Sequence, residues 1–203
     1  MNEHIMSLGN ECFYAGKLKA DSSCKNITLN NMIRSNSFIH KGDAPSLLLI
    51  DTSTNPKDCQ ELKFERNYIN FGEAAIVLFL LDYLRNNFTL SAEDVGVITT
   101  YKAQSDLINA LLTYGPKHQG TLCSTVNGFQ GKEKEAIIIS LVRTDDIGFI
   151  DDPRRLNVAL SRTKRFVALI VNFQLAQQSE TLNKIVNTIM ESKHSICWRA
   201  PRD

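Results

Sequence analysis

The stretch Ala136–Val171, AIIISLVRTDDIGFIDDPRRLNVALSRTKRFVALIV, decides the fold class of this protein. Its two ends, Ala136–Leu141 and Phe166–Val171, are short apolar runs rich in residues that favour buried strands. Between them, Pro153 stands where the first turn of a helix tolerates proline, and the apolar spacing predicts a helix to about Thr163. A strand, a helix and a second strand in this order are typical of a parallel α/β unit.

The same alternation extends along most of the chain. Further strands are predicted at Leu47–Asp51, Val95–Thr100, Thr121–Val126 and Ile196–Trp198. Further helices are predicted at Asn2–Tyr14, Asn70–Asn86, Gln104–Leu112 and Ser179–Glu191. Residues Lys17–Ala44 read as loop. We therefore expect an α/β fold with a mostly parallel sheet, in which residues 1–45 form an extension that packs on a domain of residues 46–203.

The composition excludes several classes of protein. The 203 residues carry a formal net charge of +1, so a polyanion would have to be recognised by a local cluster of residues. The apolar runs are too short to span a bilayer, and the first residues do not resemble a secretory signal. Five scattered cysteines without ligand spacing predict no metal site and favour a reducing compartment. We expect a cytoplasmic or nuclear protein without membrane contact.

The sequence TTYKAQ, residues 99–104, places hydroxyl, amide and ammonium groups after a predicted strand. Ligands of parallel sheets bind outside the carboxyl ends of the strands, so this turn is a candidate contact for nucleic-acid phosphates. An ordinary capped helix start is the alternative interpretation.

A second candidate is STVNGFQGKEKE, residues 124–135. Its two glycines, three residues apart, allow the backbone to turn sharply. From this turn Gln130 and Glu133 would project toward a ligand, with the glutamate accepting hydrogen bonds from ribose hydroxyls and Thr125 donating to a phosphate. A solvated charged hairpin is the alternative.

The third candidate is a pair of arginines on the helix that follows Pro153. Arg155 and Arg162 are seven residues apart, so they lie within about 20° of each other around the helix axis. Guanidinium groups on a partly buried helix need anionic partners, and a γ-phosphate across an interface is one such partner. The alternative partners are the nearby acids Asp145, Asp146, Asp151 and Asp152.

These segments match family motifs in the correct order. Thr125–Lys134 reads TVNGFQGKEK, which resembles T-V-D-x-F-Q-G-x-E-K, and Arg154–Lys164 reads RRLNVALSRTK, which resembles R-R-L-N-V-A-L-T-R-A-K. Val95–Gln104 reads VGVITTYKAQ, which is similar to IGVITPYxxQ. Together they resemble the C-terminal motor domain of superfamily-one helicases, in the group of the nonsense-mediated-decay helicase, the immunoglobulin-mu-binding helicase and the replication nuclease-helicase. Met1–Leu18 resembles the stretch after motif four, so the resemblance covers essentially the whole chain.

The resemblance implies a RecA-like fold, of the type found in the second domain of phosphate-loop NTPases, and a role for each matching residue. Arg162 would be the arginine finger on the γ-phosphate of ATP, supported by Arg155. The residues facing the nucleotide would be Gln130, Gly131 and Glu133. The track for single-stranded RNA or DNA would be lined by Thr99, Tyr101, Gln104, Thr125 and Asn127. Departures from the family pattern are Asn127 for aspartate, Thr100 for proline, Ser161 for threonine and Thr163 for alanine, and the first removes a charge at a position that usually couples the two sites.

No GxxxxGK[ST] phosphate loop occurs in the sequence, and no apolar strand ends in an Asp-Glu pair. The expected cofactor, ATP with Mg²⁺, would therefore be shared with a first RecA-like domain that these 203 residues lack. We expect an ATP-dependent helicase as a complete two-domain motor, and little ATPase activity from the isolated chain. The alternative is a non-catalytic fragment that binds nucleic acid or protein. A Rossmann-type enzyme is disfavoured because no GxGxxG follows the first strand.

Overall fold

Six parallel strands form the central sheet in the computed structural model, which describes residues 1–199. In spatial order they are β5 (Leu122–Thr125), β4 (Val95–Thr99), β6 (Lys134–Ser140), β7 (Thr163–Val171), β1 (Leu47–Asp51) and β8 (Ser195–Arg199). Every neighbouring pair in this sheet is parallel. The predicted α/β fold with a parallel sheet is confirmed.

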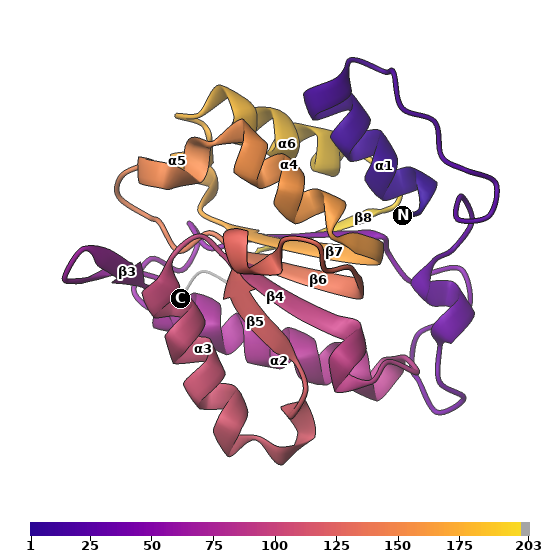
Figure 1. Ribbon diagram of the computed structural model, residues 1–203, viewed down its shortest axis with the longest axis horizontal. Helices are drawn as coiled ribbons and strands as arrows, with labels where there is room; N and C mark the ends of the chain where they lie inside the picture. The colour runs from indigo at the N-terminus through magenta and orange to yellow at the C-terminus, as the bar shows by residue number, and fades with distance from the viewer. Residues whose placement is uncertain (200–203) are drawn as a thin grey trace.

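Helices cover both faces of this sheet (Figure 1). One face carries α1 (Glu3–Gly9), α4 (Pro153–Ser161), α5 (Phe173–Ala176) and α6 (Glu180–Glu191). The other carries α2 (Phe71–Asn87) and α3 (Lys102–Tyr114). Side chains alternate along each strand, so Ile137 and Ile139 of β6 join the first core, while Ile138 joins the second. Strands buried on both faces explain the continuous apolar runs in the sequence.

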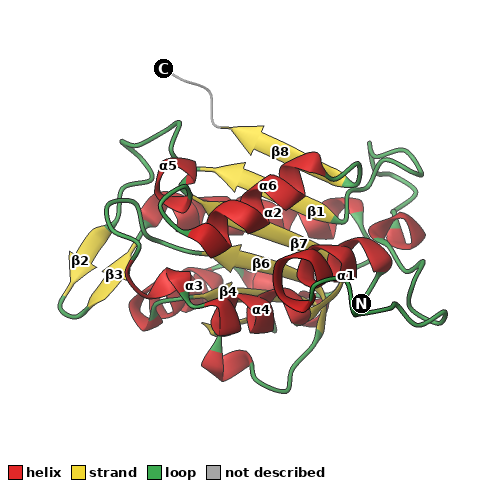
Figure 2. Ribbon diagram, turned by 90° about the horizontal axis from the view of Figure 1, so that it is seen from above, coloured by secondary structure: helices red, strands yellow, loops and turns green. Residues whose placement is uncertain are grey.

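A small hairpin that the sequence did not reveal lies beside the sheet. Strands β2 (Leu62–Phe64) and β3 (Asn67–Ile69) pair in antiparallel fashion, and Figure 2 shows them beyond the carboxyl ends of the long strands. Each strand has only three residues, too few for an alternating pattern to be recognised. A second difference is that α4 ends at Ser161 and β7 already begins at Thr163, because Thr163 pairs with Lys134 of β6.

The first 45 residues contribute to both cores. Ile5 and Leu8 of α1 are each 1% exposed and join the core under α4 and α6, and a π-helical turn over Asn10–Tyr14 extends this helix. The backbone N–H of Asn2 donates to the carbonyl of Lys164, 2.8 Å away, which fixes the helix at the start of β7. Leu29 is buried in the opposite core.

An apolar groove of about 550 Å³ lies between α2 and the edge strand β8, with Phe79, Ile196 and Trp198 in its walls. None of its lining residues is charged, so it is not suited to binding a phosphate. Across the described residues, no helix combines the length and apolar character needed to cross a membrane.

Candidate functional site

Helix α4 presents its arginines beside its buried stripe, on the flank that faces the turn between β5 and β6. The carboxylate of Asp152 caps the helix by accepting from the backbone N–H groups of Arg154 and Arg155 at 2.9 and 3.4 Å. Leu156, Ala159 and Leu160 are at most 5% exposed and face the core, as their spacing predicts. The remaining sides of the helix are therefore free to hold polar groups at the surface.

The turn between β5 and β6 approaches α4 because of the strand order. Since β4 lies between β5 and β6, the connection must cross the face of β4. Phe129 fixes this crossing, because its ring is fully buried directly over Gly96. A Cβ atom at Gly96 would lie 2.4 Å from Cζ of Phe129, so only glycine leaves room for the ring.

Two glycines in this turn are required by its geometry. A Cβ at Gly128 would lie 2.0 Å from Oγ of Ser124, and Gly131 has a φ of +75°, which side-chain-bearing residues rarely adopt. The prediction that the two glycines allow a sharp turn is confirmed.

The turn and the helix enclose a pocket of about 260 Å³. Its lining consists of Val126, Asn127, Gln130, Arg154, Arg155, Val158 and Arg162. Four of the predicted site residues thus lie together, although they come from two segments of the sequence. Gly131 and Glu133 are exposed in the same turn but do not line the pocket.

Positive charge dominates this pocket, which we call the arginine pocket. Three guanidinium groups and no carboxylate line it. Arg155 contacts Asp152 at 3.4 Å, where both side chains are about half exposed, so this pair stabilises the fold little. Arg162 donates from Nε to the carbonyl of Val158 at 3.3 Å, and within residues 1–199 it forms no ion pair. The alternative of aspartate partners therefore holds for Arg155 and fails for Arg162.

Of the residues expected along the nucleic-acid track, the structure leaves two accessible and buries three. Asn127 is exposed and Thr125 is half-buried, both at the carboxyl end of β5. Thr99 and Gln104 are fully buried, and Tyr101 is only 5% exposed. The interior position of these three side chains departs from the expectation that they face a ligand.

Gln104 shows the physical reason for this departure. Its Nε2 donates to the carbonyl of Asn70 at 3.0 Å, and its Oε1 accepts from the N–H of Asn70 at 2.8 Å. The second N–H of Nε2 donates to Oγ of Ser140 at 3.4 Å, so both donors of the amide are used inside the protein and none remains for a phosphate. Asn70 was not singled out in the sequence because its partner lies 34 residues away.

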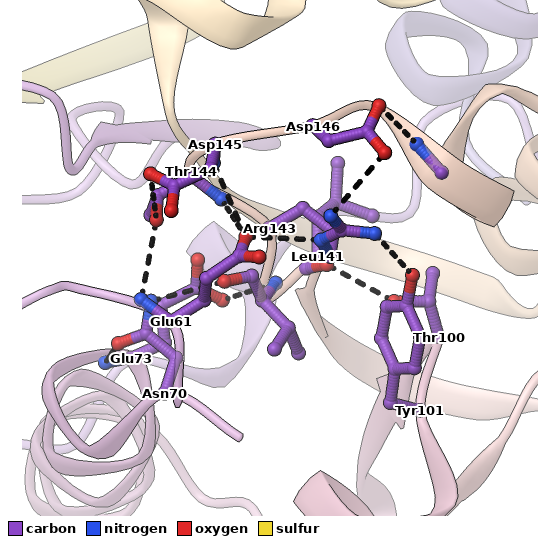
Figure 3. Close-up of polar contacts among 12 residues, drawn as sticks. Glu61, Asn70, Glu73, Thr100, Tyr101, Leu141, Arg143, Thr144, Asp145 and Asp146 are labelled. Carbon is purple, nitrogen blue, oxygen red and sulfur yellow. Dashed lines mark hydrogen bonds and ion pairs between the residues drawn. The ribbon is translucent and has the colours of Figure 1, made fainter. Parts of the chain in front are cut away.

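A second polar cluster at the carboxyl end of β6 was also missed (Figure 3). Arg143, Glu61 and Glu73 are buried there, and each is bonded to segments that are distant in sequence. Burial raises the pKa of Glu73 to about 7, although hydrogen bonds from Ser140 and Val142 oppose that shift. Burial disfavours the charged form of Arg143, but its hydrogen bonds to Glu61 and Tyr101 outweigh this and raise its pKa.

In the described part of the chain, no group of three or more His, Cys, Asp or Glu side chains could hold a metal ion. The arrangement offers guanidinium and amide donors, which bind oxyanions rather than cations. A phosphate-bearing ligand is the chemistry that the arginine pocket suits.

Comparison with known proteins agrees with this geometry. Residues 1–174 match the model of a family described as an AAA domain. The chain belongs to this family. An uncharacterized ATP-dependent helicase of Methanocaldococcus jannaschii is 37% identical over 192 residues, which are 92% of this chain and 27% of the relative. The DNA polymerase alpha-associated DNA helicase A of Saccharomyces cerevisiae is 34% identical over 186 residues, 88% of this chain and 27% of the relative.

DNA-binding protein SMUBP-2 of Rattus norvegicus is 31% identical over 198 residues, which are 94% of this chain and 19% of that protein. The AAA-domain chain thus spans about a quarter or less of these relatives. The crystal structure of the C-terminal domain of a possible DNA helicase from Lactobacillus plantarum has the same fold, with a TM-score of 0.50 and 13% identity over 96% of this chain and 95% of that one. The resemblance to superfamily-one helicases and the RecA-like layout are therefore confirmed.

Proposed function

We propose that this chain is the second RecA-like domain of an ATP-dependent helicase, and that it supplies arginines to ATP bound mainly by a first domain. The arginine pocket carries this proposal, because three guanidinium groups without a lining carboxylate form a site for a polyanion. The relatives named as helicases support the same activity.

Arg162 is the proposed arginine finger. It lies at the C-terminal end of α4, lines the pocket and has no ion-pair partner in the described residues, so its charge is available to a γ-phosphate. Arg155 is the proposed supporting group, and Gln130 lies across the same pocket. Gly131 and Glu133 extend this edge and are proposed to face the nucleotide once a first domain closes the pocket. ATP would bring its Mg²⁺ on the side of that first domain.

Single-stranded RNA or DNA is the proposed track ligand. Asn127 and Thr125 are the accessible track residues, and they stand next to the arginine pocket in one turn. Thr99, Tyr101 and Gln104 are proposed to shape this edge from inside, since their side chains are buried. Residues 1–45 are proposed to belong to the motor domain as a packed extension, because Ile5 and Leu8 lie in its core.

A non-catalytic fragment that binds nucleic acid or protein is the second candidate, favoured by the absence of a phosphate loop from these residues. The two candidates differ in whether Arg162 matters for ATP turnover. A helicase domain needs this guanidinium in the transition state, whereas a binding fragment does not.

The deciding experiment joins this chain to a first RecA-like domain that carries a phosphate loop. ATP hydrolysis is measured with and without a single-stranded oligonucleotide. We expect Arg162→Ala to lower the rate at saturating ATP by about 10³-fold, with nucleotide affinity roughly retained. Lys193→Ala, an exposed cation outside the pocket, is the control and should leave the rate unchanged. Near-normal turnover in Arg162→Ala would favour the binding fragment.

A further inference from the structure

Arg143 is the most highly connected buried cation of the described residues, and it lies outside the arginine pocket. The residue is 4% exposed, and its Nε donates to Oε2 of Glu61 at 2.9 Å. Its Nη1 donates to the hydroxyl of Tyr101 at 3.1 Å, and the guanidinium stacks 4.0 Å from the ring centre of Tyr68. Figure 3 shows the contacts of Arg143 with Glu61, before β2, and with Tyr101, after β4. Through Tyr68 the same side chain also reaches strand β3.

The backbone that leads into Arg143 is strained and held in place. The N–H of Arg143 donates to the carbonyl of Leu141 at 2.9 Å, and Val142 between them has a φ of +74°. This is a γ-turn of the rare, strained kind, centred on a buried β-branched residue. Asn70 donates to the carbonyl of Val142 at 3.1 Å, and Glu73 accepts from its N–H at 3.0 Å. The first turn of α2 therefore holds a conformation that the chain would not adopt locally.

The segment that follows Arg143 is the one from which the arginine helix starts. Glu61 Oε2 also accepts from the N–H groups of Thr144 and Asp145, at 2.5 and 3.2 Å. Gly148 packs directly on the guanidinium, since a Cβ there would lie 2.2 Å from Nη1 of Arg143. Four residues later Asp152 caps α4. Arg143 also forms an ion pair with Asp146 at 3.8 Å, so it contacts this segment at two points. Further along, the buried side chain of Ile150 and the hydrogen bond from Ser179 to Asp151 anchor the same segment.

We propose that Arg143 is a positioning residue for the arginine pocket, because its guanidinium seats the segment 144–152 and so fixes where α4 presents Arg155 and Arg162. This inference rests on the proposed function for its catalytic consequence. Arg143 itself does not line the pocket and touches neither Arg155 nor Arg162. Its effect on ATP turnover is transmitted through the start of the helix.

The claim that Arg143 holds the start of α4 is tested on the 203-residue chain by hydrogen exchange. Lysine cannot form the two directional contacts of the guanidinium, so Arg143→Lys should lower the protection of residues 148–156 by about tenfold, as expected for a lost hydrogen bond to a charged group. Tyr68→Leu removes the stacking ring and should act in the same direction. Tyr68→Phe keeps the ring and is the matched control. Protection of residues 184–191 in α6, beyond the cap at Ser179 that contacts Asp151, should be unchanged in all three, whereas a general loss of stability would lower it too.

The claim that Arg143 affects ATP turnover is tested with the same variants, each joined to a first domain that carries a phosphate loop. We expect Arg143→Lys to lower kcat by about tenfold with the KM for ATP within about twofold, because misplaced arginines act in the transition state more than in binding. An unchanged kcat, or equal loss of protection in residues 184–191 of α6 and in residues 148–156, overturns the inference. The proposed function is refuted instead if the unmodified chain joined to the first domain does not hydrolyse ATP, or if Arg162→Ala turns over fully. In that case the hydrogen-exchange data still decide whether Arg143 holds the start of α4.

Discussion

Replacement of Glu73 by glutamine should change how the stability of this protein depends on pH. The carboxyl group is fully buried, and its Oε2 accepts from Oγ of Ser140 at 2.6 Å and from the N–H of Val142 at 3.0 Å. Its Oε1 is buried without a hydrogen-bond partner in the described residues. A glutamine can accept the same two bonds without placing a charge in the interior.

The magnitude follows from the pKa of Glu73, which burial raises from 4.5 to about 7. Because the folded state holds the proton more tightly than the unfolded state, ionisation destabilises the fold as pH rises from about 4.5 to about 7. With these two values the cost is about 2–3 kcal/mol greater at pH 8 than at pH 5. Titrating groups that do not interact with Glu73 are shared by both proteins, so their contributions cancel in the difference.

The assay is urea unfolding of the 203-residue chain, followed by circular dichroism at pH 5 and pH 8. The free energy of unfolding of Glu73→Gln, relative to the unmodified protein, should rise by about 2–3 kcal/mol between these two pH values. Glu11→Gln, at an exposed carboxylate, is the control and should show no such change. Parallel pH profiles for Glu73→Gln and the unmodified protein would refute the reasoning, because they would mean that Glu73 ionises equally easily in both states.

Two further experiments, one on a substitution and one on thiol labelling, test the packing of the buried residues. Phe129→Ala removes a fully buried ring that fixes the turn over Gly96, so it should cost about 3–5 kcal/mol of unfolding free energy by urea denaturation; Phe149→Ala, at an exposed ring, should cost far less. Burial raises the pKa of Cys123 to about 12, so iodoacetamide at pH 8 should leave it unmodified in the folded protein while the exposed Cys197 is labelled, as read by peptide mass spectrometry. Equal labelling of both thiols would contradict the buried position of Cys123.

Local patterns were sufficient for most of the secondary structure. The apolar spacing of Leu156, Ala159 and Leu160 predicted which side of α4 is buried, and all three are at most 5% exposed. Continuous apolar runs predicted the buried strands, because strands covered on both faces have no polar side. The hairpin β2–β3 was missed, since three-residue strands carry no readable period.

The position of a site residue could be predicted where it depends on the local turn or helix that carries the residue. It could not be predicted where the side chain bonds to a residue that is distant in sequence. Gln130, Arg155 and Arg162 were expected at the nucleotide and Asn127 on the nucleic-acid track, and all four line one pocket. Gln104 was expected to face a ligand and instead bonds to Asn70, 34 residues away. A buried amide and an exposed one look alike in sequence, because only a tertiary contact determines which partner satisfies them.

The sequence alone determined the parallel α/β fold, the glycine-dependent turn and the family, since periodicity, glycine requirements and ordered motifs are local properties of the chain. Only the tertiary structure decided that Phe129 crosses β4 over Gly96 and that Arg162 lacks an ion-pair partner in residues 1–199. It alone also identified Arg143, which no motif singled out. The physical reason is that burial, pairing of charges and backbone strain depend on segments that meet across the sheet, and the distance between them in sequence leaves no local pattern.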